Sequence, residues 1–317
     1  MVQGMYEPCG SGTPPMNASE SSLSRARTPA ALAAITLIWG ANFSVVKFAL
    51  SDCAPLAFTT VRFVLASAVM WGVLAGTGAS VRIERRHWMS VIGLALVGTT
   101  GNQSLFISGI DRTLAGNASL ILATGPVFTT LLAAAFRQER ITWRAVAGGG
   151  LSVAGAGLVI LGSARGVGLS AGTLPGDLLV LAAALGWAIY TVGSAPLVRR
   201  YGAIPLTAAT MWIGTAGLLV VAAPAIRAQA WTAVRPATWL AVFYSGAFSI
   251  ATAYLLWAYC LRQIGSTRTV VYTNATPLVA LALAWATLGE MPSPLQVVGA
   301  VGIVAGSLVV TLQSRSK

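Results

Sequence analysis

Long apolar stretches separated by short polar loops follow one another from residue 30 to residue 313. A bilayer core about 30 Å thick is crossed by a helix of roughly 20 apolar residues. Stretches of that length recur along the chain, and the loops between them are too short to form a soluble domain. The pattern predicts an all-α, polytopic membrane protein with ten transmembrane helices, at residues 30–50, 57–76, 88–109, 114–136, 143–162, 176–196, 205–225, 238–261, 267–288 and 294–313.

The composition supports this prediction. The chain has 317 residues, of which 56% are hydrophobic and 9% are charged. Soluble domains carry about 25% charged residues, so the composition excludes a soluble enzyme. The net charge of +12 does not indicate a nucleic-acid partner, because the Lys and Arg residues form no single patch.

Positive charges in the loops predict the orientation of the chain. If the N-terminus is cytoplasmic, the cytoplasmic loops and ends hold most of them: Arg25, Arg27, Arg82, Arg85, Arg86, Arg137, Arg140, Arg144, Arg199, Arg200, Arg262, Arg268, Arg315 and Lys317. The outer loops then hold Arg112, Arg165, Arg227 and Arg235. Because positive residues stay inside, both termini are predicted to be cytoplasmic, with the chain in the bacterial inner (plasma) membrane.

The first 28 residues differ from the rest of the chain. They hold two acids, three prolines and many serines, and they lack the basic-then-apolar order of a signal peptide. We predict a disordered cytoplasmic tail at residues 1–28, unless Met16 is the true start of the protein.

The chain contains an internal repeat. When it is shifted by 151 residues, Pro126 meets Pro277, Glu139 meets Glu290, Gly148 meets Gly299, Gly155 meets Gly306 and Trp88 meets Trp239. These matches predict two five-helix repeats at residues 29–163 and 176–313, joined by an outer loop at 164–176. Since five is an odd number, the second repeat enters the membrane from the opposite side. Inverted repeats are typical of alternating-access transporters.

Several short motifs follow one another in a fixed order: Trp39-Gly40-Ala41-Asn42-Phe43 with Lys47, then Pro55 with Arg62, then Pro126 with Glu139, then Gly186-Trp187-Ala188-Ile189-Tyr190, and finally Pro277 with Glu290. With the duplication, this order resembles the EamA-type branch of the drug/metabolite transporter superfamily over residues 30–313. The resemblance implies ten helices, cytoplasmic termini and efflux of small metabolites such as amino acids, or of drugs. It does not specify the substrate.

Polar and aromatic side chains within the predicted spans are the candidates for a substrate site. Buried amides in lipid need partners, so these side chains are expected to face the interior or a wet cavity. The candidate substrate-binding residues are Trp39, Asn42, Phe43, Lys47, Asn102, Gln103, Thr124, Trp187, Tyr190, Tyr254, Trp257, Tyr272 and Asn274. Such a pocket suits small neutral or zwitterionic amphipathic solutes.

Prolines and charges within the spans are candidates for gating. Pro126 and Pro277 each lack an N–H and are expected to kink their helices near the cavity. Arg62 is an intramembrane charge and a candidate for an outer gate. Lys47 and Arg62 together leave a second function open, the exchange of anionic metabolites. Glu139 and Glu290 are expected to be solvated acids near the N-terminus of the following helix.

Enzymatic chemistry has no support in the sequence. The spans carry no nucleophile triad and no pair of carboxylates at mid-depth, and Cys9, Cys53, Cys260 and His87 lack the spacing of a metal site. We therefore predict a transporter without metal or cofactor, acting on a small-molecule substrate as a monomer or homodimer. A non-transporting membrane scaffold is the remaining alternative.

Overall fold

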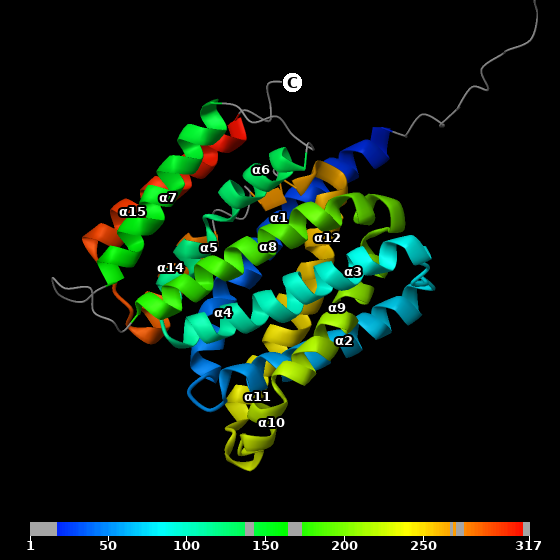
Figure 1. The fold of residues 1–317 in the computed structure, drawn as a ribbon, viewed down its shortest axis with the longest axis horizontal. Helices are drawn as coiled ribbons and strands as arrows, with labels where there is room; N and C mark the ends of the chain where they lie inside the picture. Colours follow the sequence, from blue (N-terminus) through cyan, green and yellow to red (C-terminus); the bar gives the residue numbers. More distant parts are fainter. Residues whose placement is uncertain (1–17, 137–142, 164–172, 267–268, 271–275, 313–317) are drawn as a thin grey trace, which may run out of the picture.

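The computed structural model describes residues 18–136, 143–163, 173–266, 269–270 and 276–312 (Figure 1). All regular secondary structure in these ranges is helical, as the apolar pattern predicts. The helices are α1 (Ala18–Ala49), α2 (Pro55–Thr77), α3 (Trp88–Ala95), α4 (Asn102–Asp111), α5 (Ala115–Leu122), α6 (Gly125–Ala135), α7 (Trp143–Ser163), α8 (Leu174–Tyr201), α9 (Ala203–Val221), α10 (Ala223–Ala228), α11 (Pro236–Phe243), α12 (Ala253–Ile264), α14 (Thr276–Leu288) and α15 (Pro294–Leu312).

Among the described residues, 7 helical segments are long and apolar enough to cross a membrane. They are Arg27–Ala49, Pro55–Thr77, Arg85–Asp111, Ala115–Ala135, Leu174–Tyr201, Ala203–Val221 and Pro236–Ile264. Shorter apolar helices lie at Val146–Val159, Thr276–Leu288 and Pro294–Gly306. These helices overlap the predicted spans. Because the three shorter helices fall below the length of a membrane span, the ten-span topology stays a prediction.

Helix α1 begins at Ala18, so part of the segment predicted as a disordered tail is helical. Pro29 lies inside this helix rather than before it. A helix can continue past Pro29 because every other residue adds a hydrogen bond within the segment, so only the bond of the missing proline N–H is lost. Residues 1–17 and residues 164–172 of the predicted 164–176 loop lie outside the described residues.

Two long segments each contain a stretch of π-helix. The segment η2 (Leu96–Gly101) joins α3 to α4, and η4 (Tyr244–Thr252) joins α11 to α12. Shifted by 151 residues, η2 falls inside η4. A π-helical turn is wider than an α-helical turn and frequently marks a functional site.

The fourth apolar segment is interrupted between α5 and α6, at Ala123 and Thr124. Pro126 lies in the first turn of α6, where its missing N–H leaves no gap in the helix. Pro277 has the same place in α14, and residues 271–275 before it lie outside the described residues.

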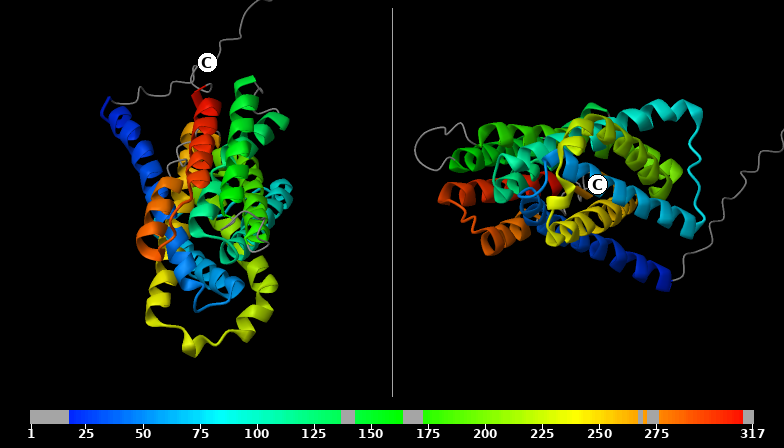
Figure 2. Two further views of the ribbon diagram at one scale, coloured as in Figure 1. Left: turned by 90° about the vertical axis from the view of Figure 1, so that its left-hand side faces the viewer. Right: turned by 90° about the horizontal axis from the view of Figure 1, so that it is seen from below.

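The helices pack in matched pairs. Helix α1 packs on α14 and α12, and α8 packs on α6 and α4; α2 packs on η4, and α9 packs on η2. Helices α7 and α15 lie side by side along one edge of the molecule (Figures 1 and 2). Small residues allow this close approach, since a Cβ atom on Gly155 would lie 2.6 Å from the carbonyl oxygen of Gly299.

Candidate functional site

A cavity lies where α1, α2, α4, α5, α6 and α8 meet η4, α12 and α14. The space open to the centre of a water-sized sphere is about 140 Å³. At roughly 10–15 Å³ for each water, this corresponds to about ten waters or a metabolite of similar size.

The structure brings most of the predicted site residues to this cavity. Its wall includes Trp39, Asn42, Phe43, Arg62, Asn102, Gln103, Pro126, Trp187, Tyr254, Trp257 and Pro277. Lys47, Thr124 and Tyr190 do not belong to the wall, and Tyr272 and Asn274 lie outside the described residues. The roles of these residues in binding or gating stay predictions.

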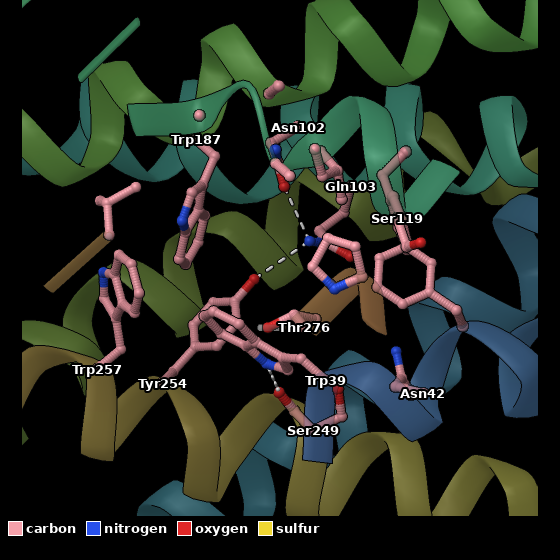
Figure 3. Close-up of a pocket in the computed structure, with 18 of the residues that line it drawn as sticks. Trp39, Asn42, Asn102, Gln103, Ser119, Trp187, Ser249, Tyr254, Trp257 and Thr276 are labelled. Carbon is pink, nitrogen blue, oxygen red and sulfur yellow. Dashed lines mark hydrogen bonds between the residues drawn. The ribbon is translucent and has the colours of Figure 1, made fainter. Parts of the chain in front are cut away.

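Aromatic rings form one side of the cavity (Figure 3). The ring centroid of Trp187 lies 5.7 Å from Trp39, 5.2 Å from Tyr254 and 5.5 Å from Trp257. Phe43 and Phe106 make an edge-to-face contact at 5.9 Å. These separations lie within the attractive range for aromatic pairs. The rings therefore give the wall a fixed shape.

A hydrogen bond to the backbone fixes the orientation of Trp39 in this aromatic wall. The indole Nε1 of Trp39 donates to the backbone oxygen of Ser249 at 2.9 Å. That oxygen belongs to η4, where the wider turn changes the usual hydrogen-bond pattern of the helix. Trp39 on α1 is thus held against the opposite half of the chain.

Arg62 is the charged residue of the described cavity wall, and only 1% of it is exposed. Its Nε and Nη2 donate to Thr59 Oγ1 at 3.1 and 3.0 Å, and its Nη1 donates to Ser245 Oγ at 2.9 Å. Its Nη2 also donates to Gln103 Oε1 at 2.8 Å. All these partners are neutral. The ion pairs of the described residues involve Glu84 or Asp52 in the loops and do not include Arg62.

Gln103 connects Arg62 to the aromatic wall. While its Oε1 accepts from Arg62, its Nε2 donates to Tyr254 Oη at 3.1 Å and to Asn102 Oδ1 at 2.8 Å. The Nδ2 of Asn102 in turn donates to the carbonyl oxygen of Ala183 at 2.7 Å. Figure 3 shows Asn102 and Gln103 above the ring of Tyr254. This network orients the polar end of the cavity.

Three polar atoms of the wall have no hydrogen-bond partner among the described residues. They are Oδ1 of Asn42, Nε1 of Trp257 and Oγ1 of Thr276, and each is buried. A buried polar group without a partner costs roughly 1–3 kcal/mol. A polar ligand in the cavity could offer partners to these atoms.

Lys47 has a different place from the one that the sequence suggests. Its Nζ donates to the carbonyl oxygens of Ile110, Asp111 and Thr113, at 2.9, 3.1 and 2.7 Å. The last carbonyls of a helix have no partner within the helix. Lys47 therefore caps the C-terminus of α4.

Tyr190 and Thr124 lie behind the wall. The ring of Tyr190 stacks on Trp187 at 5.3 Å, and its hydroxyl pairs with Thr210 Oγ1 at 3.2 Å. Thr124 donates to the carbonyl oxygen of Ile121 at 2.7 Å, at the break between α5 and α6. Tyr190 thus supports Trp187, which lines the cavity.

Glu290 caps the N-terminus of α5 rather than that of the helix which follows it. Its carboxylate oxygens accept from the backbone N–H groups of Ala115 at 3.2 Å and Gly116 at 3.1 Å. Negative charge is favourable at a helix N-terminus, but the helix concerned is not the one that we expected for Glu290. Glu139 lies outside the described residues.

Ser119, Ser249 and Thr276 belong to the wall and are absent from the predicted site. A signal for the first was present, because Ser119, Leu122, Ala123 and Pro126 follow the spacing of one helix face. Ser249 lies in a π-helical stretch, which an α-helical period does not describe.

The loop that connects α1 to α2 is tied to the start of α11. Asp52 accepts from Arg235 Nε at 2.8 Å. Hydrogen bonds from Arg235 and Thr238 lower the pKa of the Asp52 carboxyl to about 2. At neutral pH the carboxyl is therefore ionised.

Comparison with known proteins places the chain in a family. The model of the EamA-like transporter family matches residues 28–161 and again residues 174–312. The chain belongs to the EamA-like transporter family. It is therefore a membrane transporter and not an enzyme, as the sequence predicts, and the family indicates embedding in a bilayer and a small-molecule substrate.

The relatives of this EamA-like transporter are themselves described as transporters or exporters. A probable terminal-alkyne amino-acid exporter of Streptantibioticus cattleyicolor is 30% identical over 290 residues, covering 90% of this chain and 94% of the relative. The uncharacterised inner membrane transporter YedA of Escherichia coli is 26% identical, covering 89% and 90%. A crystal structure with 23% identity covers 92% of this chain and 98% of its own, with a TM-score of 0.68, which supports the fold.

Proposed function

We propose that this EamA-like chain crosses the membrane ten times as two inverted five-helix repeats, with both termini in the cytoplasm. Matched packing supports the repeat. Helix α6 packs on α8, and its counterpart α14 packs on α1; the two π-helical stretches occupy corresponding positions. The glycine contacts are reciprocal as well, since Gly155 meets Gly299 while their counterparts Gly306 and Gly148 meet each other.

Two contacts support a pseudo-twofold axis through the cavity. A twofold axis exchanges each residue with its counterpart, so counterparts touch only near the axis. Gln103 and Tyr254 are 151 residues apart and share a hydrogen bond. Ser152 and Ile303 are also 151 residues apart, and Ser152 Oγ donates to the carbonyl oxygen of Ile303 at 3.1 Å. Transporters built from inverted repeats bind their substrate at such an interface.

The protein is proposed to export small neutral or zwitterionic amphipathic solutes, amino acids among them, by alternating access. The observation that carries this proposal is the cavity between the two halves, with aromatic rings on one side and unpartnered polar atoms in its wall. The amino-acid exporter among its relatives agrees with this substrate class. A single chain encloses the cavity, so a monomer suffices, although a homodimer is compatible with it.

The alternative is the exchange of anionic metabolites. Arg62 in the cavity wall favours an anionic group on the substrate, whereas Lys47 is engaged by three carbonyl oxygens away from the wall. If anions are exchanged, Arg62 rather than Lys47 is the residue that binds them. A non-transporting scaffold has no need of a cavity with unpartnered polar groups.

Comparative mass spectrometry of the growth medium tests this proposal. The parent and the Asn42→Leu/Tyr254→Leu variant are overproduced in bacteria, and membrane levels are matched. We expect a small set of solutes to be enriched in the medium with the parent alone. Equal enrichment with the variant would contradict the proposed site. If neither the medium nor uptake into liposomes shows movement of any solute, the proposed transport is wrong.

A further inference from the structure

The charge of Arg62 lacks an anionic partner among the described residues. Its side chain is buried between the rings of Phe58 and Phe63, whose centroids lie 5.3 and 5.9 Å from its Cζ. Its hydrogen bonds go to two hydroxyls and one amide oxygen. A buried cation is costly unless an anion and well-placed hydrogen bonds compensate it. Neutral acceptors supply only part of this compensation.

The amide oxygen of Gln103 occupies the position that a ligand carboxylate would take. It lies 2.8 Å from Nη2 of Arg62, at the distance of a charge-assisted hydrogen bond. Both residues line the cavity. A carboxamide and a carboxylate present an oxygen of similar shape, but the carboxylate also neutralises the guanidinium. A ligand carboxylate therefore has reason to displace Gln103 from Arg62.

The remainder of the cavity defines the rest of the ligand. Trp39, Trp187 and Trp257 offer apolar ring faces, and no Asp or Glu lies in the described wall. Arg62 can thus neutralise one negative group of a ligand. A ligand that carries only a positive charge would be repelled by Arg62, and no acidic side chain of the described wall would offset this repulsion. Oδ1 of Asn42 and Oγ1 of Thr276 are available to a donor such as an amino group.

We infer that Arg62 binds a single carboxylate of the substrate in place of the Gln103 side chain, with the apolar part of the substrate against the tryptophans. This inference rests on the proposed function. It also gives Gln103 a second role. When the carboxylate displaces Gln103 Oε1, the amide turns and its hydrogen bond to Tyr254 is released. That bond joins the two repeats at the cavity, so occupancy and the contact between the halves are coupled.

Matched acid and amide probes test this inference on the purified full-length protein in lipid nanodiscs. The pairs are 3-phenylpropanoate with 3-phenylpropanamide, 4-methylpentanoate with its amide, and L-phenylalanine with L-phenylalaninamide. Calorimetry measures binding, and uptake into proteoliposomes measures transport. For at least one pair the parent is expected to bind the acid about tenfold more tightly than the amide. A parent that binds no acid, or every acid no better than its amide, overturns the inference.

Two substitutions separate binding from folding. Gln103→Glu gives Arg62 a permanent internal carboxylate, so acid binding is expected to fall about tenfold while amide binding changes little. Arg62→Met is expected to bring the acid-to-amide ratio to about one. Gln229→Glu and Arg227→Met, which make the same chemical changes at the end of α10 and away from the cavity wall, are the controls and should keep the parental ratio.

If Arg62→Met does not fold, Gln103→Glu alone decides. Acid binding as tight as in the parent would show that Arg62 does not accept a carboxylate at this position. Failure of the proposed function would differ, since neither acid nor amide would enter proteoliposomes faster than it enters protein-free liposomes. Transport without a preference for the acid would leave the proposed function intact and overturn only this inference.

Discussion

The close crossing of α7 and α15 gives a prediction that can be worked through in detail. On Gly155→Ala, the added Cβ would lie 2.6 Å from the carbonyl oxygen of Gly299 and 2.8 Å from the backbone nitrogen of Ile303. Ordinary contact begins at 3.4 Å, so the two backbones must separate by about 0.8 Å. Backbone atoms cannot rotate away as a side chain can.

Such a separation weakens contacts along the whole helix pair. A gap of about 0.5–1 Å removes a quarter to a half of the dispersion energy of each contact. Overpacked sites typically lose about 1–3 kcal/mol, and we expect a loss in this range for Gly155→Ala. The control is Gly157→Ala on the same helix, where a Cβ would meet nothing within 4 Å. Because alanine favours helix more than glycine does, this control is expected to be neutral or stabilising.

The assay is reversible unfolding in mixed micelles, followed by the loss of helical circular dichroism. Gly306→Ala, at the corresponding position of the other repeat, should be destabilising as well, because its Cβ would meet the carbonyl oxygen of Gly148. If Gly155→Ala is as stable as Gly157→Ala, the close backbone contact and the reasoning built on it are refuted.

Two further predictions concern Lys47 and Asp52, two charged residues near the junction of α1 and α2. Lys47→Met leaves three carbonyl oxygens at the end of α4 without their donor. We expect unfolding measurements to show a loss of stability of about 1–3 kcal/mol and the acid-to-amide preference to stay unchanged. A changed preference would show that Lys47 takes part in substrate binding. Asp52→Asn should lower the melting temperature at pH 7, because a carboxyl with a lowered pKa stabilises the fold above its unfolded pKa of about 3.9. The difference in melting temperature between the parent and the variant should shrink as the pH falls toward 2. A difference that does not depend on pH would contradict the pairing of Asp52 with Arg235.

Much of the fold could be predicted because lipid restricts the choices of the backbone. An apolar stretch in a bilayer must satisfy its own hydrogen bonds, so the length of each stretch predicts a helix. The π-helical stretches could not be found in this way, because the length of an apolar stretch predicts a helix without distinguishing an α-helical from a π-helical turn. The place of Pro126 was visible in the sequence, whereas the break at Ala123 and Thr124 depends on tertiary contacts.

The site was predictable where one helix face determined it. Trp39, Asn42 and Phe43 share a face of α1, and all three line the cavity. The spacing of Lys47 places it on the same face of α1, but its long side chain reaches the end of α4. The spacing of residues along one helix does not show where the unpaired carbonyl oxygens of another helix lie. Arg62 was expected at an outer gate, and its contact with Gln103 depends on the packing of α2 against α4.

Access to the cavity from the two sides of the membrane tests the central claim most directly. Cys9, Cys53 and Cys260 are replaced by serine, and single cysteines are introduced as Ser119→Cys in the first half and Ser249→Cys in the second. An impermeant maleimide is then applied to right-side-out and to inside-out vesicles. Alternating access predicts that each cysteine reacts from either side, and that a bound substrate slows the reaction from both. Reaction from one side only, at both positions, would contradict the account.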